Sequence, residues 1–309
     1  MKSSKQTRVA IVGASGFLGS HLTQYLLKKT LYSITAISRK GQLPNGTHSD
    51  VRLKLVPASV FDELMMTDAL EGVDTAFFFV HMMGQTNTDF YSQEALAAER
   101  FSSACKTAGV KRVIYMGGLG DDKEDLSRHL LSRHNTGMVL REHLPLVIEF
   151  RASMIIGNGS LAYDIIRNLV QKLPVMVLPK WSVSRTQPIA LSDALEYLRQ
   201  SVEINVPHSE IIEIGGRDVL SYAKLYKLYG RWSGKPRPVI RVAIIPKWLG
   251  GSWLNIFTPQ KHARVGKVMV NSLANAMVVR HPEKAQLYFP AIKPKDLQTA
   301  FSETLRRPK

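Results

Sequence analysis

Three glycines near the start of the chain have a spacing that is typical of a phosphate-binding turn. Gly13, Gly16 and Gly19 follow an apolar run, Val9–Val12, and precede a stretch with helical periodicity. In this strand–turn–helix setting the first glycine permits a tight turn, the second lets the backbone approach a pyrophosphate, and the third lets the helix pack against the strand. Amide groups of the first helical turn then face the anionic diphosphate. The sequence therefore predicts a dinucleotide-binding site rather than a plain glycine-rich turn.

The residues after the second predicted strand bear on which dinucleotide binds. That strand, Ser33–Ser38, leads into Arg39 and Lys40, where an Asp or Glu would hydrogen-bond the adenosine ribose and favour NAD. An arginine can instead bind a 2′-phosphate through charge-assisted hydrogen bonds, each worth roughly 1.5–3 kcal/mol. The sequence therefore favours NADP(H), with NAD(H) as the second choice. The plainer alternative is a solvated surface turn in which both cations face water.

His81 directly follows the fourth predicted strand, Thr75–Val80. Ligands of open α/β sheets bind beyond the carboxyl ends of the strands, so we expect this histidine beside the dinucleotide. It could donate to a ribose hydroxyl or act as an acid. A positioning role without proton transfer is the favoured interpretation.

Apolar runs that alternate with helical periodicity indicate the elements that hold these residues in place. Strands are predicted at Arg8–Val12, Ser33–Ser38, Arg52–Val56, Thr75–Val80, Arg112–Met116, Val147–Arg151 and Ile211–Ile214. Helices are predicted at Phe17–Lys29, Glu63–Glu71, Phe90–Ala108, Lys123–Glu142, Leu161–Lys172 and Leu191–Glu203. The pair Ser192 and Asp193 is expected to cap the last of these helices. The alternation predicts an α/β fold with a Rossmann-type, doubly wound parallel sheet.

The pattern loosens after Ile214 and predicts a small C-terminal lobe. A short amphipathic helix is expected at Tyr222–Trp232, and an apolar-aromatic stretch follows at Ile240–Phe257. We expect this lobe to close over the sheet. The predicted division is 1–157 with 185–216 for the dinucleotide-binding core, and 158–184 with 217–309 for a lobe that binds substrate or a partner.

The net charge of +16 is concentrated towards the C-terminus. Residues 1–219 hold 24 Lys and Arg against 22 Asp and Glu, whereas residues 220–309 hold 17 against 3. This asymmetry indicates an acidic partner. The aromatic stretch Trp248–Phe257 also has basic flanks, at Arg241, Lys247, Lys261, Arg264 and Lys267. A substrate lid is the favoured interpretation, contact with an anionic membrane or an acidic protein comes second, and nucleic acid comes last because no recognition motif is present.

The single cysteine, Cys105, excludes an intrachain disulfide and fits a reducing cytoplasm. Its place on the apolar face of a predicted helix favours a buried, inert thiol over a nucleophile. No apolar run approaches the roughly 20 residues needed to span a bilayer. We therefore expect a cytoplasmic protein, with peripheral contact at the inner face of the membrane as an option.

Further motifs resemble those of one superfamily over nearly the whole chain. The matching segments are Gly13–Gly19, Gly109–Tyr115, Glu149–Ser153 with Gly157, and Gln187–Ala190. They resemble atypical or extended short-chain dehydrogenases/reductases, in the group of NmrA-like proteins and the Rossmann accessory subunit of respiratory complex I. The segments Gly117–Gly120 and Leu126–His134 are still more similar to bacterial NAD(P)-binding proteins whose substrates are largely unassigned. The resemblance implies a Rossmann fold and NAD(P) binding.

The chain departs from this superfamily at the catalytic positions. Catalytic members have a Ser or Thr after the fifth strand, and then Tyr-x-x-x-Lys on the next helix, where the tyrosine protonates the substrate and the lysine holds the nicotinamide ribose. Here Gly117 or Gly118 takes the first position, and the other two fall near Leu130 and His134. The one Tyr-x-x-x-Lys pattern, Tyr25–Lys29, lies in the first predicted helix, away from the expected site. Loss of acid catalysis without replacement would leave little activity, because it contributes about 10²–10⁴-fold.

Basic residues near the start of that helix could take over this role. They are Arg128, His129, Arg133 and His134. The resemblance puts His134 in the lysine position, where it would contact the ribose or a phosphate, and a protonated His129 would serve as the acid. The cluster could equally bind the cofactor or another anion without turnover. Arg151, at the end of a buried strand, suits either a substrate anion or a structural ion pair.

The sequence analysis thus yields a set of candidate residues and two functions. We expect cofactor contacts from Gly13, Ser15, Gly16, Phe17, Leu18, Gly19, Ser38, Arg39, Lys40, Ser59, Val80, His81, Met82, Gly117 and His134. His129 and His134 are the catalytic candidates, Arg151 is the substrate candidate, and no metal site is predicted. The favoured function is an NADPH-dependent oxidoreductase of a small hydrophobic carbonyl or quinone-like substrate. The alternative is an NADP(H)-binding sensor or assembly factor without turnover, and an epimerase or dehydratase ranks last because it needs the same tyrosine.

Overall fold

The computed structural model describes residues 6–44, 50–82, 89–122, 124–242 and 275–305. The chain divides into two compact units. The first comprises Met1–Gly117, Ser132–Phe150 and Leu195–Ile212, and the second comprises Gly118–Leu131, Arg151–Ala194 and Glu213–Lys309. The second unit includes segments 118–131, 151–157, 185–194 and 213–216, which the sequence analysis grouped with the core.

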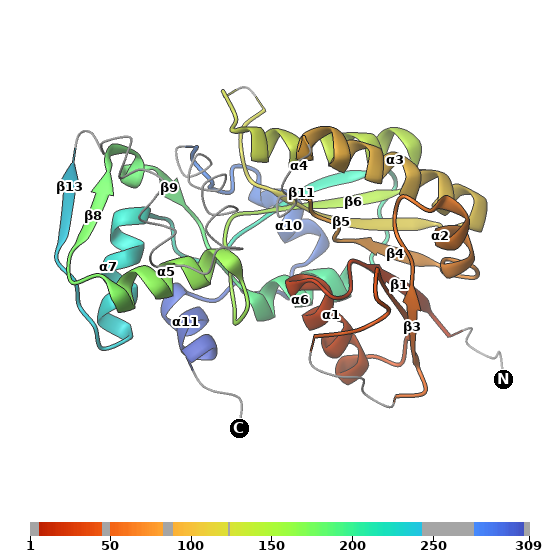
Figure 1. The fold of residues 1–309 in the computed structure, drawn as a ribbon, viewed down its shortest axis with the longest axis horizontal. Helices are drawn as coiled ribbons and strands as arrows, with labels where there is room; N and C mark the ends of the chain where they lie inside the picture. Colours follow the sequence, from red (N-terminus) through yellow and green to blue (C-terminus); the bar gives the residue numbers. More distant parts are fainter. Residues whose placement is uncertain (1–5, 45–49, 83–88, 123, 243–274, 306–309) are drawn as a thin grey trace. The chain divides into compact units, whose positions relative to one another are not determined.

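A seven-stranded sheet is the main element of the fold (Figure 1). Its strands are β1 (Arg8–Val12), β2 (Ser33–Ser38), β3 (Leu53–Pro57), β4 (Thr75–Phe78), β5 (Arg112–Gly118), β6 (Val147–Ala152) and β11 (Glu210–Ile214). They lie in the order β3-β2-β1-β4-β5-β6-β11, and the pairings from β3 to β5 are parallel. The chain order reverses between β1 and β4, which is where open α/β sheets bind their ligands. The predicted Rossmann-type fold is confirmed.

Helices cover both faces of this sheet. They are α1 (Phe17–Lys29), α2 (Glu63–Ala69), α3 (Phe90–Ala108), α4 (Arg128–His143) and α6 (Leu191–Gln200). Figure 1 shows α2, α3 and α4 on one face and α1 and α6 on the other. The hydroxyl of Tyr25 in α1 donates to Glu196 in α6 at 2.7 Å. Because both faces are covered, β4 is buried along its whole length, and Phe78 stacks on Phe101 of α3 at 4.6 Å between ring centroids.

The second unit holds the remaining elements. They are β7 (Ile155–Ile156), α5 (Leu161–Lys172), β8 (Met176–Pro179), the 3₁₀ helix η1 (Lys180–Val183), β9 (Arg185–Thr186), β10 (Ile189–Ala190), β12 (Leu220–Ser221), α7 (Tyr222–Trp232), β13 (Val239–Val242), α10 (Pro282–Tyr288) and α11 (Leu297–Leu305). Small sheets pair β10 with β7, β12 with β9 and β13 with β8. An aromatic cluster joins α5, α7 and α11, with the ring of Phe301 at 6.0 Å from Tyr163 and 5.0 Å from Tyr229.

Most element bounds agree with the prediction, and the differences fall at their ends. The strand predicted at Thr75–Val80 ends at Phe78, and the helix predicted from Lys123 begins at Arg128. The predicted cap of α6 is wrong, because this helix starts at Leu191, directly after β10 and before the expected cap residues. The side chain of Asp193 instead accepts hydrogen bonds from the backbone N–H and Nζ of Lys295, at 2.7 and 2.9 Å. A tertiary contact takes the place of the local cap.

Cys105 is fully buried on α3, as predicted. Burial raises the pKa of its thiol, because the thiolate is poorly solvated there. The side chain is therefore an inert part of the core.

Candidate functional site

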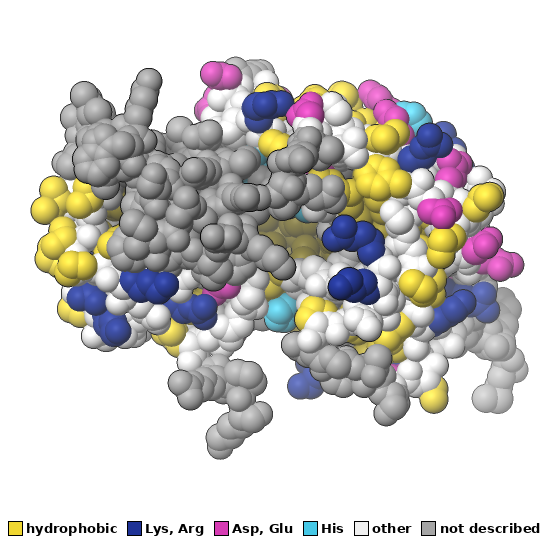
Figure 2. All heavy atoms as spheres, viewed as in Figure 1, with side chains coloured by type: hydrophobic (Ala, Val, Ile, Leu, Met, Phe, Trp, Pro, Cys, Tyr) yellow, Lys and Arg dark blue, Asp and Glu magenta, His cyan; other side chains and the backbone are white. Residues whose placement is uncertain are grey.

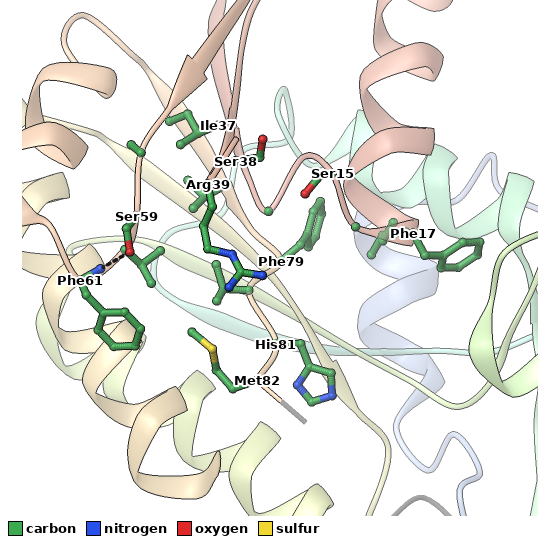
Figure 3. Close-up of a pocket in the computed structure, with 17 residues that line it drawn as sticks. Ser15, Phe17, Ile37, Ser38, Arg39, Ser59, Phe61, Phe79, His81 and Met82 are labelled. Atoms are coloured by element: carbon green, nitrogen blue, oxygen red, sulfur yellow. Dashed lines mark hydrogen bonds between the residues drawn. The ribbon is translucent and has the colours of Figure 1, made fainter. Parts of the chain in front are cut away.

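A cavity of about 680 Å³ lies at the carboxyl ends of β1, β2, β3 and β4, within the first unit (Figure 3). Its lining residues are Val12, Gly13, Ser15, Gly16, Phe17, Leu18, Ile37, Ser38, Arg39, Ala58, Ser59, Val60, Phe61, Phe79, Val80, His81 and Met82. The structure therefore brings most of the predicted cofactor contacts around one cavity. Gly19, Lys40, Gly117 and His134 are the predicted contacts that do not line it.

The glycine turn forms one wall of the cavity. Gly13 has a φ of 89°, and a Cβ there would lie 2.9 Å from the carbonyl carbon and oxygen of Phe79. A Cβ at Gly19 would lie 2.8 Å from the Cα of Ala14. The N–H groups of Gly13 and Ala14 both donate to the Ile37 carbonyl at 3.0 Å. Glycine is thus required at both ends of the turn, because backbone packs against it on either side.

The turn opens directly into the N-terminus of α1. Gly16 is the N-cap residue, makes no side-chain capping bond, and is followed by a first turn without an acidic residue. The first-turn amides have no partners within the helix, and the helix dipole makes this end favourable for an anion. The glycine turn lets a ligand approach the backbone closely, and the uncapped amides of α1 lie beside it. Together they suit the diphosphate of a dinucleotide.

Arg39, at the end of β2, is the only Lys or Arg among the described residues that line the cavity. Arg39 is exposed and has no ion-pair partner among the described residues. The chain turns sharply after it, since Gln42 N–H donates to the Ser38 hydroxyl at 3.2 Å and Gly41 has a φ of 60°. The hydroxyl of Ser59 accepts from Phe61 N–H at 3.3 Å (Figure 3). None of the lining residues is an Asp or a Glu.

The end of β4 brings His81 to the cavity together with a buried carboxylate that the sequence analysis did not identify. Nδ1 of His81 contacts Oε1 of Glu94 on α3. The same oxygen accepts from Met82 N–H at 2.8 Å, and Oε2 accepts from the Ser132 hydroxyl at 2.5 Å. Figure 3 shows His81 beside Met82 at one end of the cavity. The carboxylate thus holds the histidine ring and the backbone that follows it.

Glu94 is ionised despite its burial. Burial favours the neutral acid, but the hydrogen bond and charge of His81, the charge of Arg133 and the Met82 N–H together hold its pKa at about 2. A signal for it was present in the sequence. Glu94 lies on the apolar face of α3, in helical register with the buried Ala97, Ala98 and Phe101.

The predicted catalytic residues on α4 do not line the cavity. The guanidinium of Arg133 donates to the Met116 carbonyl and lies 4.8 Å from the centroid of the Tyr115 ring. His134 is buried, and His129 is half-buried in the first turn of the helix. Leu130, in the tyrosine position, is also buried. Neither histidine lines the cavity, so their catalytic roles remain predictions.

Arg151 is buried at the end of β6 and forms an ion pair with Asp122 at 3.1 Å. The role of Arg151 as a ligand of a substrate anion remains a prediction. Gly117 lies at the end of β5, where a Cβ would be 3.3 Å from Oε1 of Glu149. A side chain at that position would therefore press on the carboxylate of Glu149.

The basic aromatic segment lies mostly outside the described residues. Trp248–Phe257, Lys247, Lys261, Arg264 and Lys267 all fall within 243–274. In the described part of the second unit, Lys and Arg side chains gather near α5 and α7 (Figure 2). Among the described helices, none combines the length and the hydrophobicity that a membrane span requires.

Comparison with known proteins gives the fold and the family. No curated protein matches the sequence. Among solved structures, DesIV, a dTDP-glucose 4,6-dehydratase from Streptomyces venezuelae with NAD and TYD bound, is 16% identical with a TM-score of 0.72, and the match covers 97% of this chain and 96% of that one. The Bordetella bronchiseptica enzyme WbmG, in complex with NAD and UDP, is 15% identical with a TM-score of 0.70, over 99% and 94% of the two chains.

A nucleoside-diphosphate-sugar epimerase from Staphylococcus aureus is 14% identical with a TM-score of 0.72, over 94% of this chain and 98% of that one. At such identities the likeness establishes the fold alone, which is the Rossmann-type fold described above. In sequence, residues 13–168 match the NAD(P)H-binding family. This stretch begins at the first glycine of the turn and contains every cavity-lining residue except Val12. The chain therefore belongs to the NAD(P)H-binding family.

Proposed function

We propose that this protein is an NADPH-dependent oxidoreductase that reduces a small hydrophobic carbonyl or quinone-like compound. The observation that carries the choice of cofactor is the composition of the cavity lining. Arg39 faces it without a carboxylate among the lining residues, which suits a 2′-phosphate and offers no acceptor pair for a 2′-hydroxyl. DesIV and WbmG were solved with NAD, so this preference would separate the chain from those two enzymes.

Different residues of the cavity would bind different parts of the cofactor. The glycine turn and the α1 N-terminus would bind the diphosphate, and Arg39 would bind the adenosine phosphate. The apolar side chains of Val60 and Phe61 suit the adenine ring. When bound, the reduced nicotinamide supplies the hydride, so the protein has to supply orientation and an electrophilic contact.

The electrophilic contact is assigned to α4. The usual tyrosine position holds the buried Leu130, so an acid must come from another residue. We assign this role to His129, and a ribose contact to His134. The same substitution argues against epimerase or dehydratase chemistry, which needs the tyrosine that Leu130 replaces.

Titration of the purified protein with NADPH and NADH, followed by fluorescence, tests the binding. A screen of quinones and aldehydes for NADPH oxidation then tests the reaction. Tight binding with no oxidation of any acceptor would contradict the reductase and support the sensor without turnover. Where turnover is found, His129→Ala should lower kcat by about 10²–10⁴-fold, and an unchanged kcat would remove His129 as the acid.

A further inference from the structure

Helices α3 and α4 meet the loop after β4 at a single carboxylate. Glu94 is 2% exposed, and its donors are His81 Nδ1, the Met82 amide and the Ser132 hydroxyl. Two of these belong to the loop after β4, and the third belongs to α4. A buried charge is tolerated only when several donors surround it, and removing one partner leaves an uncompensated ion. Burial of the Glu94 charge therefore costs free energy, and apolar packing could hold the same loop without that cost.

Unlike an apolar contact, a carboxylate can fix the orientation of an imidazole ring. A carboxylate at Nδ1 sets the position of the ring and requires a proton on that nitrogen, which assigns Nε2 to the other side of the ring. His81 lines the cavity, and its side chain is 33% exposed. The ring is thus held from its buried side and presented to the cavity from the other.

The part of a dinucleotide that would meet this ring follows from the neighbouring backbone. The phosphate-binding turn packs on the loop after β4, since a Cβ at Gly13 would lie 2.9 Å from the Phe79 carbonyl. His81 follows Phe79 by two residues in the same lining. Arg39, in contrast, comes from the end of β2. The imidazole therefore belongs to the diphosphate side of the cavity.

We propose that Glu94, supported by Ser132, is a positioning residue that orients His81 so that Nε2 hydrogen-bonds the ribose or diphosphate oxygens of the bound dinucleotide. The proposal rests on the proposed function insofar as the cavity binds a dinucleotide. It does not depend on which substrate is reduced, or on whether turnover occurs.

Two variants separate this role from simple loop anchoring. The side-chain amide of Asn places an N–H close to the position of Nδ1 and has no counterpart of Nε2. His81→Asn should therefore keep the contact with Glu94 and the melting temperature, yet raise the Kd for NADPH and NADH alike by roughly tenfold. Glu94→Gln should raise both Kd values similarly, because the ring loses its charged anchor. Glu99→Gln, an exposed position on the same helix, is the matched control and should leave both unchanged.

A double variant tests whether Glu94 acts through His81. If it does, Glu94→Gln should add little further loss of affinity in the His81→Asn background, whereas independent roles would give additive losses. Should Glu94→Gln fail to fold, the His81→Asn titration decides alone. Wild-type affinity in folded His81→Asn overturns the inference and leaves the proposed function standing. Absence of any nucleotide binding by the wild type overturns both.

Discussion

The two ends of the nucleotide cavity hold their key side chains in opposite ways. Arg39 extends from the tip of a turn after β2, is exposed, and has no ion-pair partner among the described residues. His81 follows β4 and is held by a buried carboxylate that also binds a backbone amide and a hydroxyl. At one end Arg39 offers a positive charge, and at the other end His81 offers a ring whose orientation is fixed.

This difference shows how binding strength and geometry can be divided within one cavity. An exposed guanidinium keeps its long-range attraction for a phosphate, although salt screens part of it. An imidazole must point in one direction to make a useful hydrogen bond. The rigid support that Glu94 gives to His81 can therefore offset the free energy that burying its carboxylate costs. We therefore expect Arg39 to decide which nucleotide binds and His81 to decide how it is placed.

The largest effect on stability and nucleotide binding is expected at the glycine turn, because both ends of the cavity depend on it. Gly13→Ala forces a side chain into a φ of 89° and against the Phe79 backbone, so it should cost about 3 kcal/mol of stability and abolish binding of both nucleotides. Gly109→Ala is the matched control, because its φ of 72° carries the same strain but nothing lies within 4 Å. Denaturant unfolding and nucleotide titration of both variants check this. Equal losses would show that the packing on Phe79 is unimportant.

The buried end should show a pH dependence that the exposed end lacks. The pKa of Glu94 falls from 4.5 to about 2 on folding, so its contribution to stability is complete above pH 4.5 and is lost as the pH falls towards 2. At neutral pH this amounts to roughly 3–4 kcal/mol, since each pKa unit is worth about 1.4 kcal/mol. The unfolding free energies of wild type and Glu94→Gln, measured over a pH series, should therefore converge in acid. A gap independent of pH would mean that the carboxyl is not ionised in the fold.

The exposed end should act on one nucleotide only. Arg39→Ala should weaken NADPH on the order of 10- to 100-fold and leave NADH nearly unchanged, because only NADPH carries the 2′-phosphate. Lys40→Ala is the control, since Lys40 is exposed but does not line the cavity. Calorimetric titration of each variant with both nucleotides measures the difference. Equal losses for the two nucleotides would refute the assignment of Arg39 to the phosphate.

The smallest effect is the response to salt. Added salt should reduce the preference for NADPH over NADH in the wild type, because the Arg39–phosphate attraction is exposed and screened. The preference that remains in Arg39→Ala should respond less. The ratio of the two Kd values over a salt series is the measurement, and a ratio that stays constant in the wild type would place the selectivity in buried contacts instead.

The cavity residues that sequence analysis found are those whose role is local. Gly13 and Gly16 are recognisable from their spacing between a strand and a helix, and Arg39 from its place after the second strand. Each needs only the end of one strand and the chain reversal that follows it. The position of such residues is therefore fixed over a few bonds.

The residues that the sequence analysis did not find, or placed wrongly, depend on partners distant in the chain. Glu94 serves His81 only because α3 packs beside β4, and Ser132 joins them from α4. Asp193 was expected to cap its own helix and instead binds Lys295, 102 residues away. A side-chain acceptor can serve any donor that the fold brings near, so local pattern alone cannot name its partner.

The order of apolar strands and helices, and the glycines between the first pair, determined the Rossmann fold and the presence of a nucleotide site from the sequence alone. Those features follow from backbone sterics and from which face of each element must leave water. Only the tertiary structure decided that His81 rests on a buried, ionised Glu94, because that charge is stable solely where the loop after β4 and helix α4 direct three donors at it.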